Sequence, residues 1–303
     1  MTALRGATGA GAHHPAGTLA TGPWALSLTP EAAGWAYSGL HVLELAPGAS
    51  EVFSTGGDEV IVLPLSGACL VESSDDLFIL NGRPDVFSGV TDFAYLPRDT
   101  DVTVTSQAGG RFALPSARAR RRRSPCYVAA TDVPVELRGA GSCSRQVNNF
   151  GTPDALDADR VIACEVLTPA GNWSSYPPHK HDEDRPGEAV LEEIYYFEVA
   201  AGPAGPGVAF QRVYGSEDRP VDIVAEVRSG DVVTIPHGWH GPSMAAPGYH
   251  LYYLNVMAGP ADERAWLICD DPAHAWVRDT WTDQPLDSRL PLTTAASTEG
   301  RKL

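Results

Sequence analysis

The chain has 303 residues, enough for two domains of ordinary size. Its formal net charge of -16 disfavours a nucleic-acid partner, and no apolar run approaches the ~20 residues that a membrane span needs. Five cysteines without a CxxC pair, and an N-terminus without a secretory pattern, fit reduced thiols in a cytosol. We therefore expect a cytoplasmic protein that binds neither nucleic acid nor membranes.

The pattern of apolar residues predicts an all-β chain. Residues 1–23 hold few apolar side chains, and we expect them to be a disordered tail. From Trp24 onwards, short apolar or alternating runs are separated by turn signals such as PG, GG and NG, and Asn81-Gly82 is a strong hairpin signal. The runs are 37–45, 59–65, 68–72, 77–80, 93–96 and 102–105. This spacing is typical of β-sandwiches or barrels of the jelly-roll type.

The two halves of the chain look like two copies of one module, an N-terminal domain (24–145) and a C-terminal domain (146–303). Glu59 leads the run VIVLPLSG much as Glu193 leads IYYFEVAAG. Residues 54–57 (STGG) stand where the second half has His179-Lys180-His181, and no histidine follows Pro97. We therefore predict that only the C-terminal domain binds a metal.

The junction between the halves is rich in arginine and small polar residues. The basic cluster 118–123 could bind an anion or RNA, but on an acidic chain a solvated loop that pairs with nearby carboxylates is the expected role. Residues 138–150 have the composition of a crossing between domains. Arg145 in this crossing is a candidate contact for substrate.

The most informative stretch of the C-terminal domain begins at His179. His179 and His181 alternate with Lys180, so on an extended chain both imidazoles point to one face and Lys180 to the other. The adjacent acids Glu192 and Glu193 open the next strand and can return a carboxylate to that face. Two imidazoles and a carboxylate form a ligand set that suits Zn, Mn, Fe or Ni.

Strand alternation helps to choose between the two acids. If Glu193 faces inward, Tyr195 and Phe197 line the interior with it, whereas an inward Glu192 would also bury Glu198. Burial of Glu198 without a partner would be costly, so Glu193 is the favoured ligand. Glu192 then remains available beside the site.

The third imidazole comes from residues 230–240 (GDVVTIPHGWH), where an apolar strand ends in a turn that presents His237 and His240. An isolated HxH is more often an incidental surface pair. The combination of HxH, a strand-leading glutamate, the GDVVTIP strand and a late histidine instead resembles the cupin motif. We predict a metal on His179, His181, Glu193 and His240.

Further side chains are candidates for a catalytic or substrate-binding role beside the metal. Lys180 is one of only two lysines, and its ammonium could meet a carboxylate or a developing oxyanion, although a solvent-facing role is as plausible. Arg212 interrupts an apolar strand, where a bare guanidinium is expensive to bury, so we expect it to reach a carboxylate. Tyr252 or Tyr253 is expected to point inward from the strand that closes the barrel.

Several segments together closely resemble the 5-deoxy-glucuronate isomerases, the inositol-catabolic branch of the bicupin uronate isomerase family. They are SSYPPHKHDED, LEEIYYF, FQRVY, GDVVTIPHGWH and PGYHLYYLNVMAGP. The likeness is strong over about residues 138–276 and weaker, though in register, over the first half. It implies two cupin domains and a metal, commonly zinc, on His179, His181, Glu193 (or Glu192) and His240.

The resemblance also implies a reaction, the conversion of 5-deoxy-D-glucuronate to 5-dehydro-2-deoxy-D-gluconate in myo-inositol catabolism. This aldose–ketose isomerisation would pass through an enediolate that a metal stabilises as a Lewis acid. His237 or Glu192 would move the proton, Lys180 would assist, and Lys180, Arg212 or Arg145 would hold the substrate carboxylate. We expect a homo-oligomer. Two other functions could use the same ligands: an Fe(II) cupin dioxygenase, and a bicupin that binds sugar acids without turnover.

Overall fold

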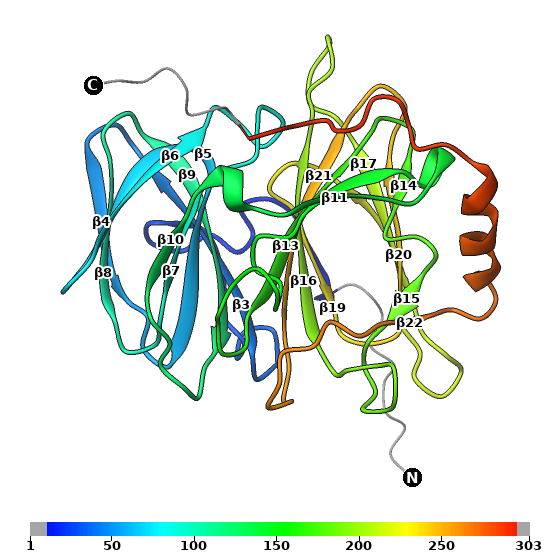
Figure 1. The fold of residues 1–303 in the computed structure, drawn as a ribbon, viewed down its shortest axis with the longest axis horizontal. Helices are drawn as coiled ribbons and strands as arrows, with labels where there is room; N and C mark the ends of the chain where they lie inside the picture. The colour runs from blue at the N-terminus through cyan, green and yellow to red at the C-terminus, as the bar shows by residue number, and fades with distance from the viewer. Residues whose placement is uncertain (1–10, 296–303) are drawn as a thin grey trace.

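The computed structural model describes residues 11–295, which form two β-barrels side by side (Figure 1). The helices described are short 3₁₀ helices: η2 (Ala130–Asp132), η3 (Gly141–Cys143) and η4 (Ala275–Asp283). Within residues 11–295, no helix has the length and apolar character needed to cross a bilayer. The predicted all-β class is confirmed.

The N-terminal domain consists of β2 to β10. The strands are β2 (Trp24–Leu28), β3 (Ser38–Leu45), β4 (Ala49–Ser54), β5 (Asp58–Ser73), β6 (Leu77–Arg83), β7 (Phe93–Leu96), β8 (Asp101–Ser106), β9 (Gly110–Arg118) and β10 (Cys126–Val128). One path of pairing runs β10-β7-β5-β9-β3-β2, and the long strand β5 also pairs with β6 and β8. Strand β5 therefore belongs to both walls of this barrel and joins two runs that the sequence separates at Gly67.

The C-terminal domain is built from two facing sheets. One has the order β1-β19-β16-β21-β13-β12-β11, and the other has the order β18-β17-β20-β15-β22, with β14 paired to β20. The strands are β1 (His13–His14), β11 (Val135–Arg138), β12 (Arg145–Asn148), β13 (Ile162–Thr168), β14 (Trp173–Ser174), β15 (His179–Lys180), β16 (Glu192–Val199), β17 (Ala209–Tyr214), β18 (Asp222–Val227), β19 (Val232–Ile235), β20 (Trp239–Ala245), β21 (Leu251–Ala258) and β22 (Cys269–Asp270). Because β11 and β12 pair with β13, this domain's sheet begins about ten residues before the expected boundary at 145/146.

The N-terminal segment differs from the expected disordered tail. Residues 1–10 lie outside the described residues, but His13 and His14 form β1, which pairs with β19 of the C-terminal domain. The amide of Thr234 donates to the carbonyl of Ala12 at 2.8 Å, and the imidazole of His13 contacts Asp231 at 2.9 Å. A polar sequence can thus be ordered when a sheet edge supplies its backbone partners.

The sequence predicts a hairpin turn at Asn81-Gly82, and this prediction is wrong. Strand β6 runs through both residues, and the turn between β5 and β6 closes where the Ser73 amide donates to the Asp76 carbonyl at 2.9 Å. Gly82 has φ 60°, and a Cβ there would lie 1.8 Å from the carbonyl oxygen of Gly67. Glycine at position 82 therefore allows two strands to approach closely inside the sheet.

The two domains share a hydrophobic core. One buried cluster joins Leu40 and Ile61 of the N-terminal domain to Tyr196 and Leu254 of the C-terminal domain, while separate clusters fill each barrel. Strand β3 packs against β16 and β21 at this interface. Burial of apolar surface between the domains favours one rigid body over two tethered modules.

The arginine-rich segment 118–123 runs from the end of β9 towards β10 within the N-terminal domain and pairs with carboxylates, as expected. Arg120 forms an ion pair with Asp262 at 2.7 Å, and Arg121 forms one with Asp159 at 2.8 Å. The Arg120–Asp262 pair is exposed on both sides and contributes little stability by itself, whereas the Asp159 carboxylate of the other pair is buried. The cluster is a solvated loop of the N-terminal domain that reaches carboxylates of the C-terminal domain.

Candidate metal centre

The two sheets of the C-terminal domain bring the predicted ligands together. His179 on β15 lies directly opposite His240 on β20, with ring centroids 4.4 Å apart, and His181 directly follows β15. Glu193 comes from β16 in the other sheet, so the four side chains meet between the walls of the barrel. Only barrel closure places residues this far apart in sequence at one point.

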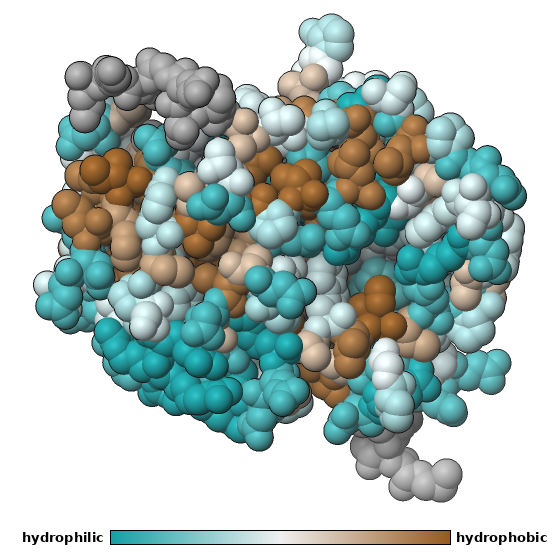
Figure 2. All heavy atoms as spheres, in the orientation of Figure 1, coloured by the Kyte–Doolittle hydropathy of each residue, from teal (hydrophilic) through white to brown (hydrophobic). Residues whose placement is uncertain are grey.

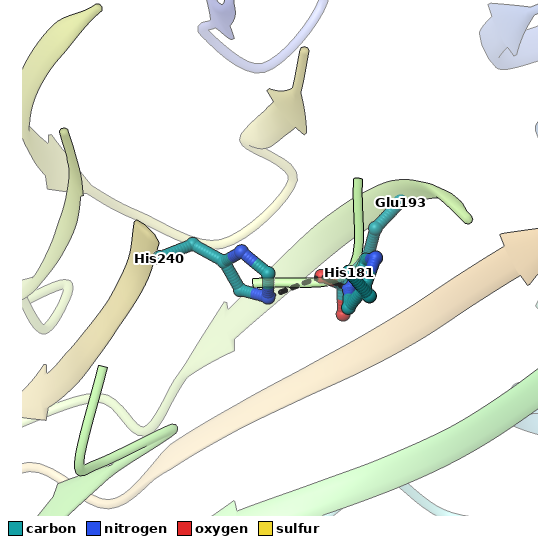
Figure 3. A group of neighbouring side chains, drawn as sticks. All are labelled: His181, Glu193 and His240. Atoms are coloured by element: carbon teal, nitrogen blue, oxygen red, sulfur yellow. Dashed lines mark hydrogen bonds and ion pairs between the residues drawn. The ribbon is translucent and has the colours of Figure 1, made fainter. Parts of the chain in front are cut away.

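One carboxylate oxygen is the centre of the group (Figure 3). Nε2 of His181 lies 3.0 Å from Oε2 of Glu193, and Nε2 of His240 lies 2.9 Å from the same oxygen. The three side chains are buried, and their ligand atoms lie within 4.8 Å of one another. His179 lies beside this trio but outside the 4.8 Å grouping, with its ring centroid 4.4 Å from that of His240 and 6.3 Å from that of His181.

Backbone carbonyls fix the orientation of all three histidines. Each Nδ1 faces a carbonyl oxygen: His181 that of Leu191 at 3.0 Å, His240 that of Gly238 at 3.3 Å, and His179 that of Pro177 at 3.4 Å. Because a carbonyl oxygen only accepts, each Nδ1 donates its proton there, which leaves Nε2 as the ring atom that can bind a cation. This is the arrangement that orients histidine ligands of metals in proteins.

Burial and mutual contacts set the charges of the group. Burial and the neighbouring His240 hold the pKa of His179 well below its usual value, which keeps this imidazole neutral. Burial alone would raise the pKa of Glu193, but His240 and His181 lower it well below its usual range. Burial would lower the pKa of His181, and its hydrogen bond to Glu193 raises it instead. The group thus holds one buried carboxylate charge among imidazoles.

These residues fit a divalent cation. Nitrogen and oxygen ligands at about 2.0–2.2 Å from one ion lie roughly 3 to 3.5 Å apart, close to the spacings of His181 and His240 from Glu193. Nε2 of His240 is buried and has no well-aligned hydrogen-bond partner among the described residues. Such an atom is costly to bury unless something binds it, so the group is a candidate site for a divalent metal.

A cavity opens beside the group, and its wall is more polar than an ordinary core. Figure 2 shows the surface hollowed over the C-terminal domain. The lining residues include His179 and Glu193 together with Tyr195, Tyr253 and Asn255. The rest of the wall is formed by Arg138, Arg145, Val147, Val166, Ser175, Tyr176, Pro177, Trp266, Ile268 and Arg278. This is the concave, mixed surface expected for a small polar ligand.

Two hydrogen bonds hold the inner wall of the cavity. Nδ2 of Asn255 donates to Oε1 of Glu193 at 2.7 Å, which leaves Oε2 for the histidines. The hydroxyls of Tyr195 and Ser175 lie 3.0 Å apart, and Ser175 has φ 49°, in the region that favours glycine. A buried serine in this conformation carries backbone strain, which proteins concentrate at functional sites.

Lys180 does not contact the cavity. Its side chain points away from the two flanking histidines, as strand alternation requires, and Nζ lies 2.8 Å from both Asp182 and Glu188. The ammonium also lies 5.6 Å from the ring of Trp239. With its charge already paired, Lys180 holds the loop after the ligand strand, and the structure does not place it as a substrate or proton contact.

Glu192 lies outside the site as well. Its carboxylate accepts hydrogen bonds of 2.8 Å from the amides of Ala36, Tyr37 and Ser38 in the N-terminal domain. Of the adjacent acids, Glu193 alone faces the histidines, as predicted, although Glu198 is also buried, on the other face of β16, where it pairs with Arg111 at 2.9 Å. The predicted proton carrier Glu192 is therefore a contact between domains.

Three other predicted residues also have partners elsewhere. Nε2 of His237 lies 3.2 Å from the carbonyl of Arg219 in a half-exposed turn. Arg212 pairs with Asp222 at the surface, so it does reach a carboxylate, but one of the protein's own. The Tyr252 hydroxyl donates at 2.8 Å to Glu165 in the interface between domains. None of these three lines the cavity beside Glu193.

Arg145 is the predicted substrate contact that does line the cavity. Tyr253, the alternative to Tyr252, lines it too, whereas sequence reasoning missed Arg138, Arg278 and Asn255. The GAGS turn at residues 139–142 could have indicated a hairpin that pairs Arg138 with Arg145. Arg278 had no such signal, because it reaches the cavity from a 3₁₀ helix far along the chain.

With the geometry established, comparison with known proteins places the chain in a family. A family model described as KduI/IolB matches residues 13–277. The chain belongs to the KduI/IolB family. The match covers both barrels, so the family assignment applies to the whole two-domain unit.

Two curated relatives of this chain share one name. The chain is 40% identical over 256 residues to the 5-deoxy-glucuronate isomerase of Geobacillus kaustophilus (strain HTA426), across 84% of this chain and 90% of that protein. It is 38% identical over 244 residues to the 5-deoxy-glucuronate isomerase of Bacillus subtilis (strain 168), across 80% and 88%. The resemblance found in the sequence motifs is confirmed.

Solved structures give the same fold. The crystal structure of an IolB-like protein from Salmonella typhimurium LT2 matches with a TM-score of 0.81 and 33% identity, across 88% of this chain and 99% of that one. Oxalate decarboxylase from Lactobacillus farciminis matches with a TM-score of 0.59 at 13% identity, across 80% and 82%. The latter likeness concerns the fold alone, and the predicted bicupin architecture is confirmed.

Proposed function

We propose that this chain is an aldose–ketose isomerase that converts 5-deoxy-D-glucuronate to 5-dehydro-2-deoxy-D-gluconate in myo-inositol catabolism. Its curated relatives have the name of this activity. The observation that carries the proposal is a buried group of His181, Glu193 and His240 whose Glu193 lines the same cavity as Arg145. One end of a sugar acid can contact this group, and the carboxylate at its other end can contact Arg145.

The proposed ligands of the metal are His179, His181, Glu193 and His240. The nitrogen-rich set favours zinc, with manganese, iron or nickel also compatible. When bound, such an ion supplies Lewis-acid stabilisation of negative charge that develops on the substrate oxygens. Asn255 keeps the Glu193 carboxylate in place while it does so, because its amide holds the oxygen that does not face the histidines.

The isomerisation moves hydrogen within the substrate, since a proton leaves C2 and one is returned to C1 without an external oxidant. The chain must therefore hold protons near the substrate. Burial raises the pKa of Tyr195 well above its usual value, so this hydroxyl keeps its proton at neutral pH. Next to Ser175 at the cavity wall, Tyr195 is positioned as a hydrogen-bond donor to a substrate oxygen.

Anaerobic incubation of the purified protein with 5-deoxy-glucuronate, with and without a chelator, tests the proposal. We expect ketose to form without O₂ and its formation to stop when the chelator removes the metal. Turnover that required O₂ would favour the dioxygenase alternative. Binding of the sugar acid without product would favour a non-catalytic bicupin.

We further propose that the protein is cytoplasmic and forms a homo-oligomer through its N-terminal domain. Val52, Leu77 and Ile79 are 67%, 59% and 62% exposed, and hydrophobic atoms gather over this domain in Figure 2. Strand pairing carries Val52 and Leu77 onto one face of β4, β8, β5 and β6. An exposed apolar sheet face of this kind often marks an interface, and sedimentation of a Val52→Lys, Ile79→Lys variant would test it.

A further inference from the structure

Three guanidinium groups line one wall of the cavity. Arg138 and Arg145 lie directly opposite each other in the antiparallel pair β11–β12, and Arg278 approaches from η4. Like charges at directly opposite positions of a sheet destabilise it. A concentration of positive charge at this place therefore needs a compensating reason.

Two of the three arginines have their own counter-ion. Arg138 pairs with Glu136 at 2.7 Å, and Nη2 of Arg278 lies 2.8 Å from Asp270, which also accepts from Nε. Both are about one-third exposed. Their charges are thus neutralised by the protein itself.

Arg145 is the most buried of the three and has no counter-ion. The residue is 8% exposed, and its guanidinium makes one hydrogen bond, from Nη1 to the carbonyl of Cys143 at 3.1 Å. It makes no ion pair with any residue between 11 and 295. Its other neighbour is the ring of Trp281, 5.6 Å away, which Arg278 contacts from 5.2 Å. Among the three arginines of this wall, Arg145 alone therefore has no counter-ion within the described residues.

A buried guanidinium without a partner is costly, so this charge is expected to be balanced by something that enters the cavity. Burial, together with repulsion from Arg138 and Arg278, lowers the pKa of Arg145 despite the nearby Tyr253 hydroxyl. Nε1 of Trp266, on the same wall, is buried without a hydrogen-bond partner. The planar guanidinium of Arg145 presents paired N–H donors that match the two oxygens of a carboxylate.

We propose that Arg145, framed by the self-neutralised Arg138 and Arg278, is a selector for one negative charge, so that the site takes monocarboxylate sugar acids. It rejects neutral aldoses, which leave the Arg145 charge unpaired. It also disfavours sugar phosphates, whose second negative charge has no free cation to meet. This inference rests on the proposed isomerase function and deepens it, because it assigns the end of the substrate opposite the metal group.

Equilibrium binding to chelator-treated protein tests the selector apart from catalysis. D-Glucuronate, D-glucose and D-glucose 6-phosphate are titrated calorimetrically at one ionic strength. We expect D-glucuronate to bind at least about 30-fold more tightly than either of the others. Equal affinity for the acid and the neutral sugar would overturn the proposal, as would tighter binding of the phosphate.

Substitution of Arg145 sharpens the test. In Arg145→Met the preference for D-glucuronate should disappear, while added guanidinium chloride at low millimolar concentration should restore part of it. Because the substitution removes an unpaired buried charge, the ligand-free variant should unfold at the same or a higher temperature than the wild type. Arg212→Met is the matched control, since Arg212 is paired at the surface, and it should keep the full preference.

The outcomes separate this inference from the isomerase proposal. Loss of charge preference in Arg145→Met, in a protein that never isomerises 5-deoxy-glucuronate, would support the selector and reject the proposed function. Turnover whose KM for 5-deoxy-glucuronate is unchanged in Arg145→Met would support the function and reject the selector. If the selector and the isomerase function are both correct, Arg145→Met should raise KM far more than it lowers kcat.

Discussion

The two barrels each place a buried glutamate at the start of a long strand, and the two carboxylates meet different partners. In the N-terminal domain, Glu59 on β5 accepts from the Tyr95 hydroxyl at 2.6 Å and from three backbone amides. In the C-terminal domain, Glu193 on β16 accepts from Asn255 and faces imidazole nitrogens. The Glu59 carboxylate is satisfied by fixed donors, whereas one oxygen of Glu193 faces the Nε2 atoms of two imidazoles that can bind a cation.

The comparison teaches that a buried acid alone does not make a metal site in this fold. What decides is whether the opposite wall supplies groups that can donate an electron pair to a cation. The counterpart of the histidine pair in the first barrel is residues 54–57, where Thr55 bonds to the backbone of Pro97 and Thr100. A hydroxyl used in this way stabilises a turn, whereas an imidazole held through Nδ1 keeps a ligand atom free.

The same comparison explains how the domains lock together. The amides that satisfy Glu59 belong to residues 159–161, which lead into the C-terminal domain. In return, Glu192 of the C-terminal domain accepts from the amides of residues 36–38. Each barrel thus contributes one acid to the other, and Glu193 alone is left for chemistry.

The largest expected effect comes from making the second barrel like the first. His181→Ala should remove the bound metal and lower turnover by roughly 10³-fold or more while the protein stays folded, because it deletes one ligand of the proposed ion. Metal content by mass spectrometry and isomerase rates check this. His237→Ala serves as control and should keep both. If His237→Ala lost turnover but kept its metal, the base role predicted from sequence would be restored.

The next effect concerns the acid of the first barrel. Glu59→Gln should lower the free energy of unfolding by about 2–4 kcal/mol, since an amide cannot accept from four donors and leaves buried polar groups unsatisfied. Denaturant unfolding measures the loss, and Glu44→Gln, at the exposed position of the otherwise mostly buried β3, is the matched control. Metal content per folded molecule should not change. A fall in metal content would contradict the assignment of the first barrel to structure alone.

A smaller effect is expected where the second barrel orients its acid. Asn255→Ala removes the donor to Oε1 of Glu193 and should weaken metal binding by about 10- to 100-fold. Competition with a chelator of known affinity measures the change. Unaltered affinity would mean that the histidines and the backbone suffice to hold the Glu193 carboxylate.

The smallest effect is a pH dependence confined to the first barrel. Burial lowers the pKa of His41, beside Trp24, from 6.5 to about 4. The unfolded chain therefore binds a proton that the folded chain refuses between these values, so stability should fall by about 1–3 kcal/mol as the pH drops from 6.5 to 4. Unfolding of wild type and His41→Gln at several pH values measures this. A wild-type slope that persists in His41→Gln would assign the effect to another group.

Much of the site could be predicted because it follows from local geometry. Strand alternation put His179 and His181 on one face, turned Lys180 to the other, and favoured Glu193 over Glu192 as the acid that faces them. The partners of the outward groups could not be predicted in this way. Lys180 is neutralised by acids in the loop that follows it, and the charges of Glu192 and Arg212 are met by groups that only the folded chain brings near.

By itself, the sequence determined the class of the fold, the family and the residues that can ligate a metal, because periodicity and motif spacing are properties of a few consecutive residues. Tertiary structure alone decided which charged side chains remain free. Arg145 and Arg212 look alike along the chain, yet one is buried without a counter-ion beside Glu193 and the other is paired at the surface. Whether a charge is neutralised depends on every element packed around it, and that information is not local.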